Sequence, residues 1–280
     1  YEITGRDGSS DVCSSDLTRP RLDSGRTSLA AARYVPCADE CARMGLAYTA
    51  LTADFGAGAV VLFGSNMGGK TVVLKTVVFF QLLAQAGLFV PAERFETSVY
   101  DRIEYVGELS GERLAGLSGF GLEVWRLIAA SAHGSASGDS AGRGRCLVAF
   151  DELARTTGSH EAEALLSAVV EAYASGGGDR AFFATHFRGV ARIPGAEYRR
   201  MRGLDKAAAA EALDGRADGP GNSGQALADR LAGINRYMRY EVVDDDGSGS
   251  ESDALAIASF LGLDRRVVER ARYFLTKGGV

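Results

Sequence analysis

A short glycine-rich stretch contains the residue types that bind phosphate groups. It fits the pattern G-x-x-x-x-G-K-[S/T] and consists of Gly64, Ser65, Asn66, Met67, Gly68, Gly69, Lys70 and Thr71. Glycines let the backbone bend tightly, so that its N–H groups can point at phosphate oxygens. Lys70 supplies a charge for the β- and γ-phosphates, and the Thr71 hydroxyl can ligate Mg²⁺. An apolar strand-like run precedes the stretch and an apolar helical run follows it, which favours a nucleoside triphosphate site over a chance glycine turn.

Two acidic residues follow another apolar run. Residues 146–150 read as a buried strand, and Asp151 and Glu152 come directly after it. In a parallel sheet, ligands bind at the carboxyl ends of the strands. Asp151 is then placed to hold Mg²⁺, and Glu152 to position and deprotonate the water that attacks the γ-phosphate. Such a pattern alone is more typical of a helix N-terminus, but the phosphate loop upstream favours the catalytic interpretation.

Two further residues have both a functional and a plain structural interpretation. His186 ends the apolar run 181–185, where it can hydrogen-bond the γ-phosphate or the attacking water. It can equally be a histidine satisfied at a strand end. Ser118 precedes a helix-like segment, where it and the amides of the helix start can bind an anion. A simple serine N-cap is the alternative.

The spacing of the apolar runs predicts the fold class. Continuous apolar runs at 59–63, 146–150 and 181–185 predict buried strands, and residues 70–86, 120–132 and 159–174 predict helices between them. Buried strands that alternate with helices are typical of a parallel sheet covered on both faces. We therefore expect an α/β nucleotide-binding fold of the P-loop type.

The remaining segments define the domain limits. Residues 1–17 lack periodicity and look like translated adapter sequence, so we expect the ATPase domain to span 18–243 and the chain to be the C-terminal fragment of a longer protein. Residues 34–55 read as short strands and turns, and 237–243 as a last strand. Residues 133–145 and 206–225 are expected to be flexible insertions or connections. A C-terminal helical segment is expected at 254–280, with two helices separated by a turn at Gly262.

Composition excludes several classes of protein. The net charge is −5, so no overall basic field attracts nucleic acid or an anionic membrane. The four cysteines (Cys13, Cys37, Cys41 and Cys146) have no zinc-like spacing with the three histidines, and reduced thiols in a cytoplasmic protein are expected. The longest apolar run, 76–90, is too short to span a bilayer.

These motifs, in this order, resemble the C-terminal ATPase domain of the MutS family. The resemblance runs from about Tyr34 to Phe274. It includes the Asn-Met-Gly-Gly-Lys core of the phosphate loop, the Leu-Ala-Gln-Ala-Gly-Leu-Phe-Val-Pro-Ala run at 83–92, and Asp-Arg-Ile at 101–103. It continues with the Ser-x-Phe-x-x-Glu signature at 118–123, Asp-Glu at 151–152, Ala-Thr-His at 184–186 and the helical tail at 256–271.

The resemblance implies an ABC-type ATPase that acts as a dimer with ATP and Mg²⁺. Lys70 and Thr71 would bind phosphate and magnesium, and Asp151 and Glu152 would complete the hydrolytic site. Ser118 would reach the γ-phosphate held by the partner subunit, which gives an ATP-dependent clamp. In the mismatch-repair members, domains N-terminal to this one contact DNA. A homodimer or a MutS-type heterodimer in DNA mismatch repair is therefore the first expectation.

Several positions differ from the mismatch-repair pattern. Ser65 replaces the usual proline, Gly119 replaces a threonine, and residues 153–157 lack the glycines of a Gly-Arg-Gly-Thr stretch. Without those glycines we expect the loop to lose access to positive φ and to take another shape. The variant pattern looks like the MutS-related proteins associated with cobalamin-dependent lysine and ornithine aminomutases.

Two functions therefore remain open on the sequence. One is a DNA-repair ATPase, and the other is an ATP-dependent reactivating factor whose client is an aminomutase. A nucleotide-binding module that no longer hydrolyses ATP is disfavoured, because Lys70, Asp151, Glu152 and His186 are all present.

Overall fold

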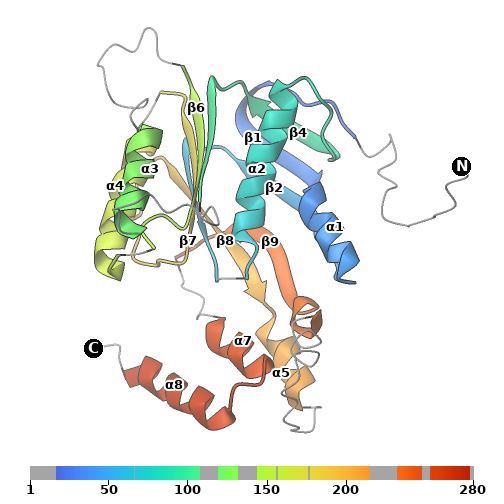
Figure 1. Ribbon diagram of the computed structural model, residues 1–280, viewed down its shortest axis with the longest axis vertical. Coiled ribbons are helices and arrows are strands. Elements are labelled where there is room, and N and C mark those ends of the chain that lie inside the picture. The colour runs from blue at the N-terminus through green and yellow to red at the C-terminus, as the bar shows by residue number, and fades with distance from the viewer. Residues whose placement is uncertain are drawn as a thin grey trace, which may run out of the picture.

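The computed structural model describes most of the chain. The described residues are 17–65, 67–107, 119–131, 144–155, 157–175, 177–214, 232–247 and 253–277. In them, two sheets pack with flanking helices, and a small helical body lies at one end of the larger sheet (Figure 1).

The larger sheet has six strands and is mainly parallel. Its order is β5 (Arg102–Val106), β6 (Cys146–Asp151), β7 (Arg180–Thr185), β3 (Ala59–Phe63), β8 (Ala196–Leu204) and β9 (Met238–Asp244). Neighbouring strands from β5 to β8 are parallel, and β9 pairs antiparallel with β8. The carboxyl ends of β3, β6 and β7 therefore meet at one edge, which confirms the predicted α/β architecture.

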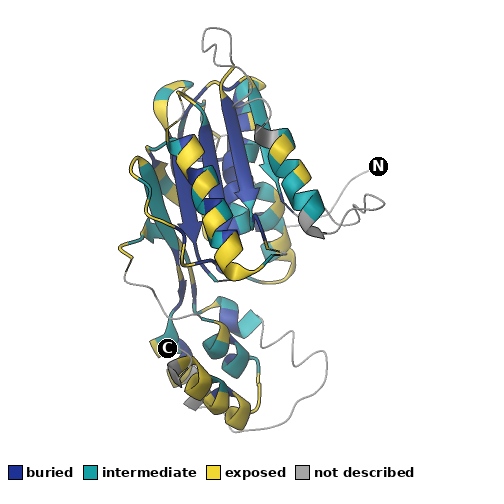
Figure 2. Cartoon of the chain, turned by 90° about the vertical axis from the view of Figure 1, so that its left-hand side faces the viewer, coloured by how far each residue is buried: buried dark blue, intermediate teal, exposed yellow. Residues whose placement is uncertain are grey.

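Helices cover both faces of this sheet, so its central strands are apolar on both sides. Val60 and Leu62 belong to the core under α2 (Lys70–Gln85), whereas Val61 and Phe63 belong to the core under α4 (Ser159–Ala174). Helix α3 (Gly119–Ser131) packs on the same side as α4. Figure 2 shows the buried strands between helices whose outer faces are exposed. This double burial explains the continuous apolar runs in the sequence.

A smaller antiparallel sheet packs on the α2 side. Its order is β2 (Leu51–Phe55), β1 (Asp23–Ala32) and β4 (Arg94–Ser98). Arg180, buried at the start of β7, donates hydrogen bonds to the carbonyl oxygens of Phe55 and Gly25. One guanidinium thus links the two sheets.

The C-terminal helices form a separate small core. Leu204 and Met238, at adjoining ends of β8 and β9, pack with residues of α5 (Lys206–Asp214) and α7 (Ala254–Phe260). Helix α8 (Arg265–Lys277) follows after the turn at Gly262, whose φ is +95°. The two predicted C-terminal helices are therefore confirmed.

Two predictions of irregular structure are wrong. Residues 35–43, expected as strands and turns, form α1 (Val35–Arg43), which begins with Pro36 in its first turn. Residues 206–214, expected as a loose connection, form α5, because four consecutive alanines favour a helix strongly. Residues 215–225 and 133–143 lie outside the described part of the chain. Strand β1 was not among the predicted elements.

The limits at 1–17, 18–243 and 254–280 remain predictions, since residues 1–16 are not described. None of the helices in the described ranges is long and apolar enough to cross a membrane.

Candidate functional site

The glycine-rich stretch forms the connection between β3 and α2. Gly69, the last residue before α2, has φ of +90°, and Met67 also lies in the left-handed region at +81°. A side chain at Gly68 would bring its Cβ to 3.0 Å from the carbonyl oxygen of Ser65, and at Gly69 to 3.0 Å from the Tyr240 ring. Glycine is therefore favoured at both positions, most strongly at Gly69, where the positive φ would also strain any other residue. Asn66 lies outside the described residues.

Lys70 is buried inside this loop. Its side chain is 4% exposed, and its ammonium donates hydrogen bonds to the carbonyl oxygens of Gly64 (2.9 Å) and Ser65 (3.0 Å). Glu152 Oε1 lies 3.6 Å from Nζ. Burial lowers the pKa of Lys70, and the charge of Glu152 opposes this effect. The carbonyl oxygens of the glycine-rich loop thus fix the position of the Lys70 ammonium.

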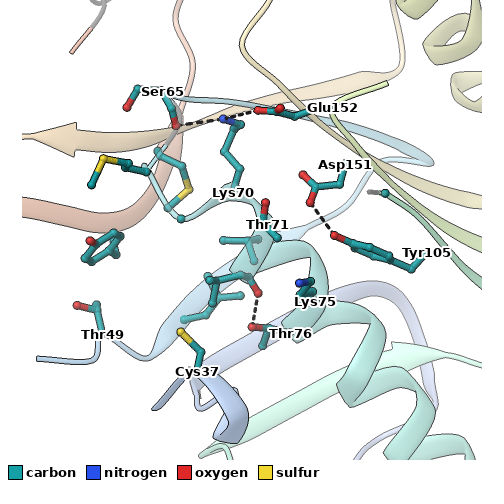
Figure 3. A pocket seen from close by; sticks show the side chains of 18 of the residues that line it. Cys37, Thr49, Ser65, Lys70, Thr71, Lys75, Thr76, Tyr105, Asp151 and Glu152 are labelled. Atoms are coloured by element: carbon teal, nitrogen blue, oxygen red, sulfur yellow. Dashed lines mark hydrogen bonds and ion pairs between the residues drawn. The ribbon is translucent and has the colours of Figure 1, made fainter. Parts of the chain in front are cut away.

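Asp151 ends β6 and faces the same space. Its Oδ2 accepts a hydrogen bond of 2.6 Å from the Tyr105 hydroxyl, whose pKa is raised far above its usual range by burial and by Asp151. Oδ1 is buried and has no hydrogen-bond partner in the described part of the chain. Figure 3 shows the Asp151 carboxylate and the Thr71 hydroxyl directed into the space beside Lys70.

These oxygens fit a magnesium ion. Carboxylate and hydroxyl oxygens are hard ligands, and Mg²⁺ in nucleotide sites typically uses one or two protein ligands with phosphates and waters. Within the described residues, no group of three or more His, Cys, Asp or Glu side chains could hold a metal by itself. Thr71 and Asp151 are therefore suited to a metal that arrives with a nucleotide.

Glu152 and His186 meet next to Lys70. The Glu152 backbone N–H donates to the Ala184 carbonyl oxygen at 3.0 Å, which fixes the residue beside the end of β7. His186 Nδ1 lies 3.8 Å from Glu152 Oε1. The structure thus brings together Lys70, Asp151, Glu152 and His186 from three strand ends. Ser118 lies outside the described residues.

The loop after the two acids corrects one prediction. Glu152 has φ of +58° and Ala154 of +64°, so residues other than glycine do adopt the left-handed region here. The expectation that the lack of glycine bars positive φ is therefore wrong. A non-glycine residue in this conformation lowers the stability of the folded state by on the order of 1–3 kcal/mol. The conformation is kept only where surrounding contacts fix it. Ala154 is fully buried, and the Glu152 N–H is bonded to β7, which supplies that constraint.

A cavity of about 880 Å³ is lined by Lys70, Asp151 and Glu152, and its size is in the usual range for small-molecule sites. It is lined by the loop, by Tyr105, Asp151 and Glu152, and by residues that sequence reasoning missed: Cys37, Cys41, Tyr48, Asn235 and Tyr240. These come from separate segments, and no local motif marks them. The two thiols, one helical turn apart, were the one visible signal, but α1 was not predicted.

The loop also contacts the C-terminal body. Ser65 Oγ donates to Asp253 Oδ2 at 3.2 Å, and the same oxygen accepts the Leu204 N–H at 3.2 Å. Lys206 Nζ lies 3.7 Å from Asp253 Oδ1. Asp253 precedes α7, so one carboxylate connects the glycine-rich loop to the C-terminal helices.

Residues 60–277 match the MutS domain V family. The DNA mismatch repair protein MutS of Nitratidesulfovibrio vulgaris is 30% identical over 218 residues, covering 77% of this chain and 21% of that protein. The DNA mismatch repair protein MSH3 of Chaetomium globosum is 31% identical over 215 residues, 76% of this chain and 17% of that protein. MSH2 of Saccharomyces cerevisiae is 35% identical over 134 residues, 48% of this chain and 13% of that protein.

The chain thus spans about a fifth or less of the length of these relatives. The matched residues include the glycine-rich stretch 64–71, both acids and His186. The chain therefore belongs to the MutS domain V family.

Proposed function

We propose that this domain binds and hydrolyses ATP with Mg²⁺, and that ATP switches a dimer of such domains between two states. The observation that carries the proposal is the buried Lys70 ammonium in its glycine loop, facing Asp151 and Glu152 across one cavity. A cation, bent backbone amides at a helix start and two acids at the ends of parallel strands suit phosphoryl transfer to water.

We assign each residue a role from its position in the site. Lys70 and the N–H groups of the loop hold the β- and γ-phosphates, and Thr71 and Asp151 hold Mg²⁺, which would offset phosphate charge. Glu152 orients the attacking water and accepts its proton. His186 lies next to Glu152 and is placed to hydrogen-bond the same water or the γ-phosphate.

The dimeric part of the proposal rests on the family resemblance. Ser118 of one subunit would contact the γ-phosphate held by the other, so ATP would join the two domains and hydrolysis would release them. A homodimer and a MutS-type heterodimer both fit this arrangement.

For the biological role, we propose DNA mismatch repair by the longer protein. The support is that the relatives above are named as DNA mismatch repair proteins. The aminomutase-linked role rested partly on the loop after the acids. Because Ala154 takes positive φ without being glycine, that difference in sequence does not by itself exclude the left-handed backbone conformation. We therefore do not put the reactivating role forward as a second proposal.

The role is tested by the ATPase rate of the full-length gene product with matched and mismatched duplex DNA. We expect the mismatched duplex to change the rate and the matched duplex to change it less. An ATPase rate that neither duplex changes would contradict the repair role and would favour a protein client.

Lys70→Ala tests nucleotide binding. We expect loss of measurable ATP binding by calorimetric titration, because the variant removes the one buried cation of the loop. Arg266→Ala on α8 is the control: this cation is exposed and is not among the residues that line the cavity, so binding should persist. Equal ATP affinity of wild type and Lys70→Ala would refute the phosphate-loop assignment.

Glu152→Gln tests hydrolysis separately from binding. The amide keeps the shape of the side chain but cannot accept a proton, so we expect ATP to bind, turnover to fall by about 10²-fold or more, and a dimer to accumulate with ATP. Steady-state phosphate release and light scattering measure the two effects. Glu171→Gln, on the exposed face of α4, should behave as wild type. Wild-type turnover in Glu152→Gln would remove Glu152 from this role.

Tyr105→Phe tests the support of the metal site. It removes the hydroxyl that donates to Asp151 and keeps the ring. Outer-shell partners of metal ligands typically contribute about 10- to 100-fold to metal affinity. We expect a weakening of that size in Mn²⁺ binding to the ADP complex, measured by electron paramagnetic resonance, with metal-free ADP affinity unchanged. Tyr173→Phe on α4 is the control, and unchanged Mn²⁺ affinity in Tyr105→Phe would show that Tyr105 does not position Asp151.

A further inference from the structure

Two cysteines of α1 form a pair. Cys37 and Cys41 are four residues apart on this helix and therefore lie on one face of it. Both side chains are partly exposed. In contrast, Cys146 is buried in β6, and Cys13 lies outside the described residues.

The pair faces the nucleotide cavity. Both cysteines line the cavity together with Lys70 and Thr71. Tyr48 and Tyr240 also line it. Figure 3 shows the Cys37 side chain among the residues that line the cavity. The thiols therefore form part of the cavity wall and are not filling the core.

We propose that Cys37 and Cys41 are a dithiol site for a trivalent arsenical, and that its capture there excludes nucleotide from the cavity. The exclusion of nucleotide rests on the proposed function, whereas the capture of the arsenical does not. The ligand class follows from the spacing of the two sulfur atoms and from their location in a cavity wall.

The spacing favours a bridging atom over a direct disulfide. Residues four apart in a helix are separated by about 6 Å along its axis, whereas a disulfide needs Cβ atoms about 3.5–4.5 Å apart. A direct bond would therefore distort α1. A single arsenic atom with two bonds to sulfur spans the wider gap while the helix stays intact.

The reaction needs no oxidant. An arsenical R–As=O takes two thiols to give R–As(S–)₂ and one water: two As–S bonds form, the As–O bonds break, and both thiol protons leave in the water. Arsenic stays trivalent. Soft sulfur ligands suit such a soft centre.

The environment disfavours competing thiol reactions. Burial, followed by the proximity of Cys41, raises the pKa of the Cys37 thiol above its usual value. Thiolate is the species that attacks disulfides, so exchange with glutathione disulfide is slow at neutral pH. The arsenical reacts with the protonated pair, and its selectivity for this site follows from the requirement for two adjacent thiols.

The test uses phenylarsine oxide with excess glutathione as a competing monothiol, and intact-protein mass spectrometry as the readout. We expect one arsenical per chain. Cys37→Ser and Cys41→Ser should each weaken capture by about 10²-fold or more, because two-point attachment becomes one-point attachment. Cys13→Ser and Cys146→Ala should retain it. Circular dichroism verifies the fold of each variant, and Cys37→Ala replaces any serine variant that fails to fold.

A nucleotide arm of the same experiment tests the exclusion. ADP binding is first measured on the untreated chain, and saturating ADP should then slow capture, while the arsenical adduct should fail to bind ADP. Capture that survives in both single variants would overturn the dithiol site. Capture at an unchanged rate in the ADP complex would overturn the exclusion. Absent ADP binding on the untreated chain would refute the proposed function, while the stoichiometry would still decide the dithiol site.

Discussion

The burial of the Lys70 ammonium is the constraint on which the rest of the site depends. A buried charge is costly unless it is hydrogen-bonded and paired. The carbonyl oxygens of Gly64 and Ser65 and the nearby Glu152 carboxylate meet this need. The loop must bend back over its own lysine to do so, and glycine is favoured at Gly68 by the nearby backbone of Ser65 and at Gly69 by its positive φ. The sheet supplies Glu152, because β3, β7 and β6 end side by side.

Most of the fold could be predicted from the sequence, and so could the meeting of Lys70, Asp151 and Glu152 at the strand ends. Strands buried on both faces leave continuous apolar runs, and a phosphate loop has steric needs that only a few residue types meet. Tyr105 could not be predicted, because its bond to Asp151 joins residues 46 positions apart and appears only once β5 lies beside β6. Helix α5 could have been predicted from its alanines. At Ala154 the prediction was wrong for the opposite reason: the local rule that positive φ needs glycine is overridden by tertiary contacts.

The site is also connected to parts of the chain beyond the sheet. Asp253, just before α7, accepts hydrogen bonds from the Ser65 hydroxyl of the loop and from the Leu204 backbone N–H. Tyr240 of β9 packs against Gly69, and its hydroxyl donates to Asn235. The glycine-rich loop therefore contacts the C-terminal body directly, through the Asp253 carboxylate and the Tyr240 ring.

The most direct test of the central claim is a crystal structure of this chain with a non-hydrolysable ATP analogue and Mg²⁺. The account predicts the γ-phosphate within hydrogen-bond distance of Lys70, the metal on the Thr71 hydroxyl with Asp151 beside it, and a water held by Glu152. A nucleotide bound elsewhere, or phosphates that leave Lys70 bonded only to Gly64 and Ser65, would contradict it.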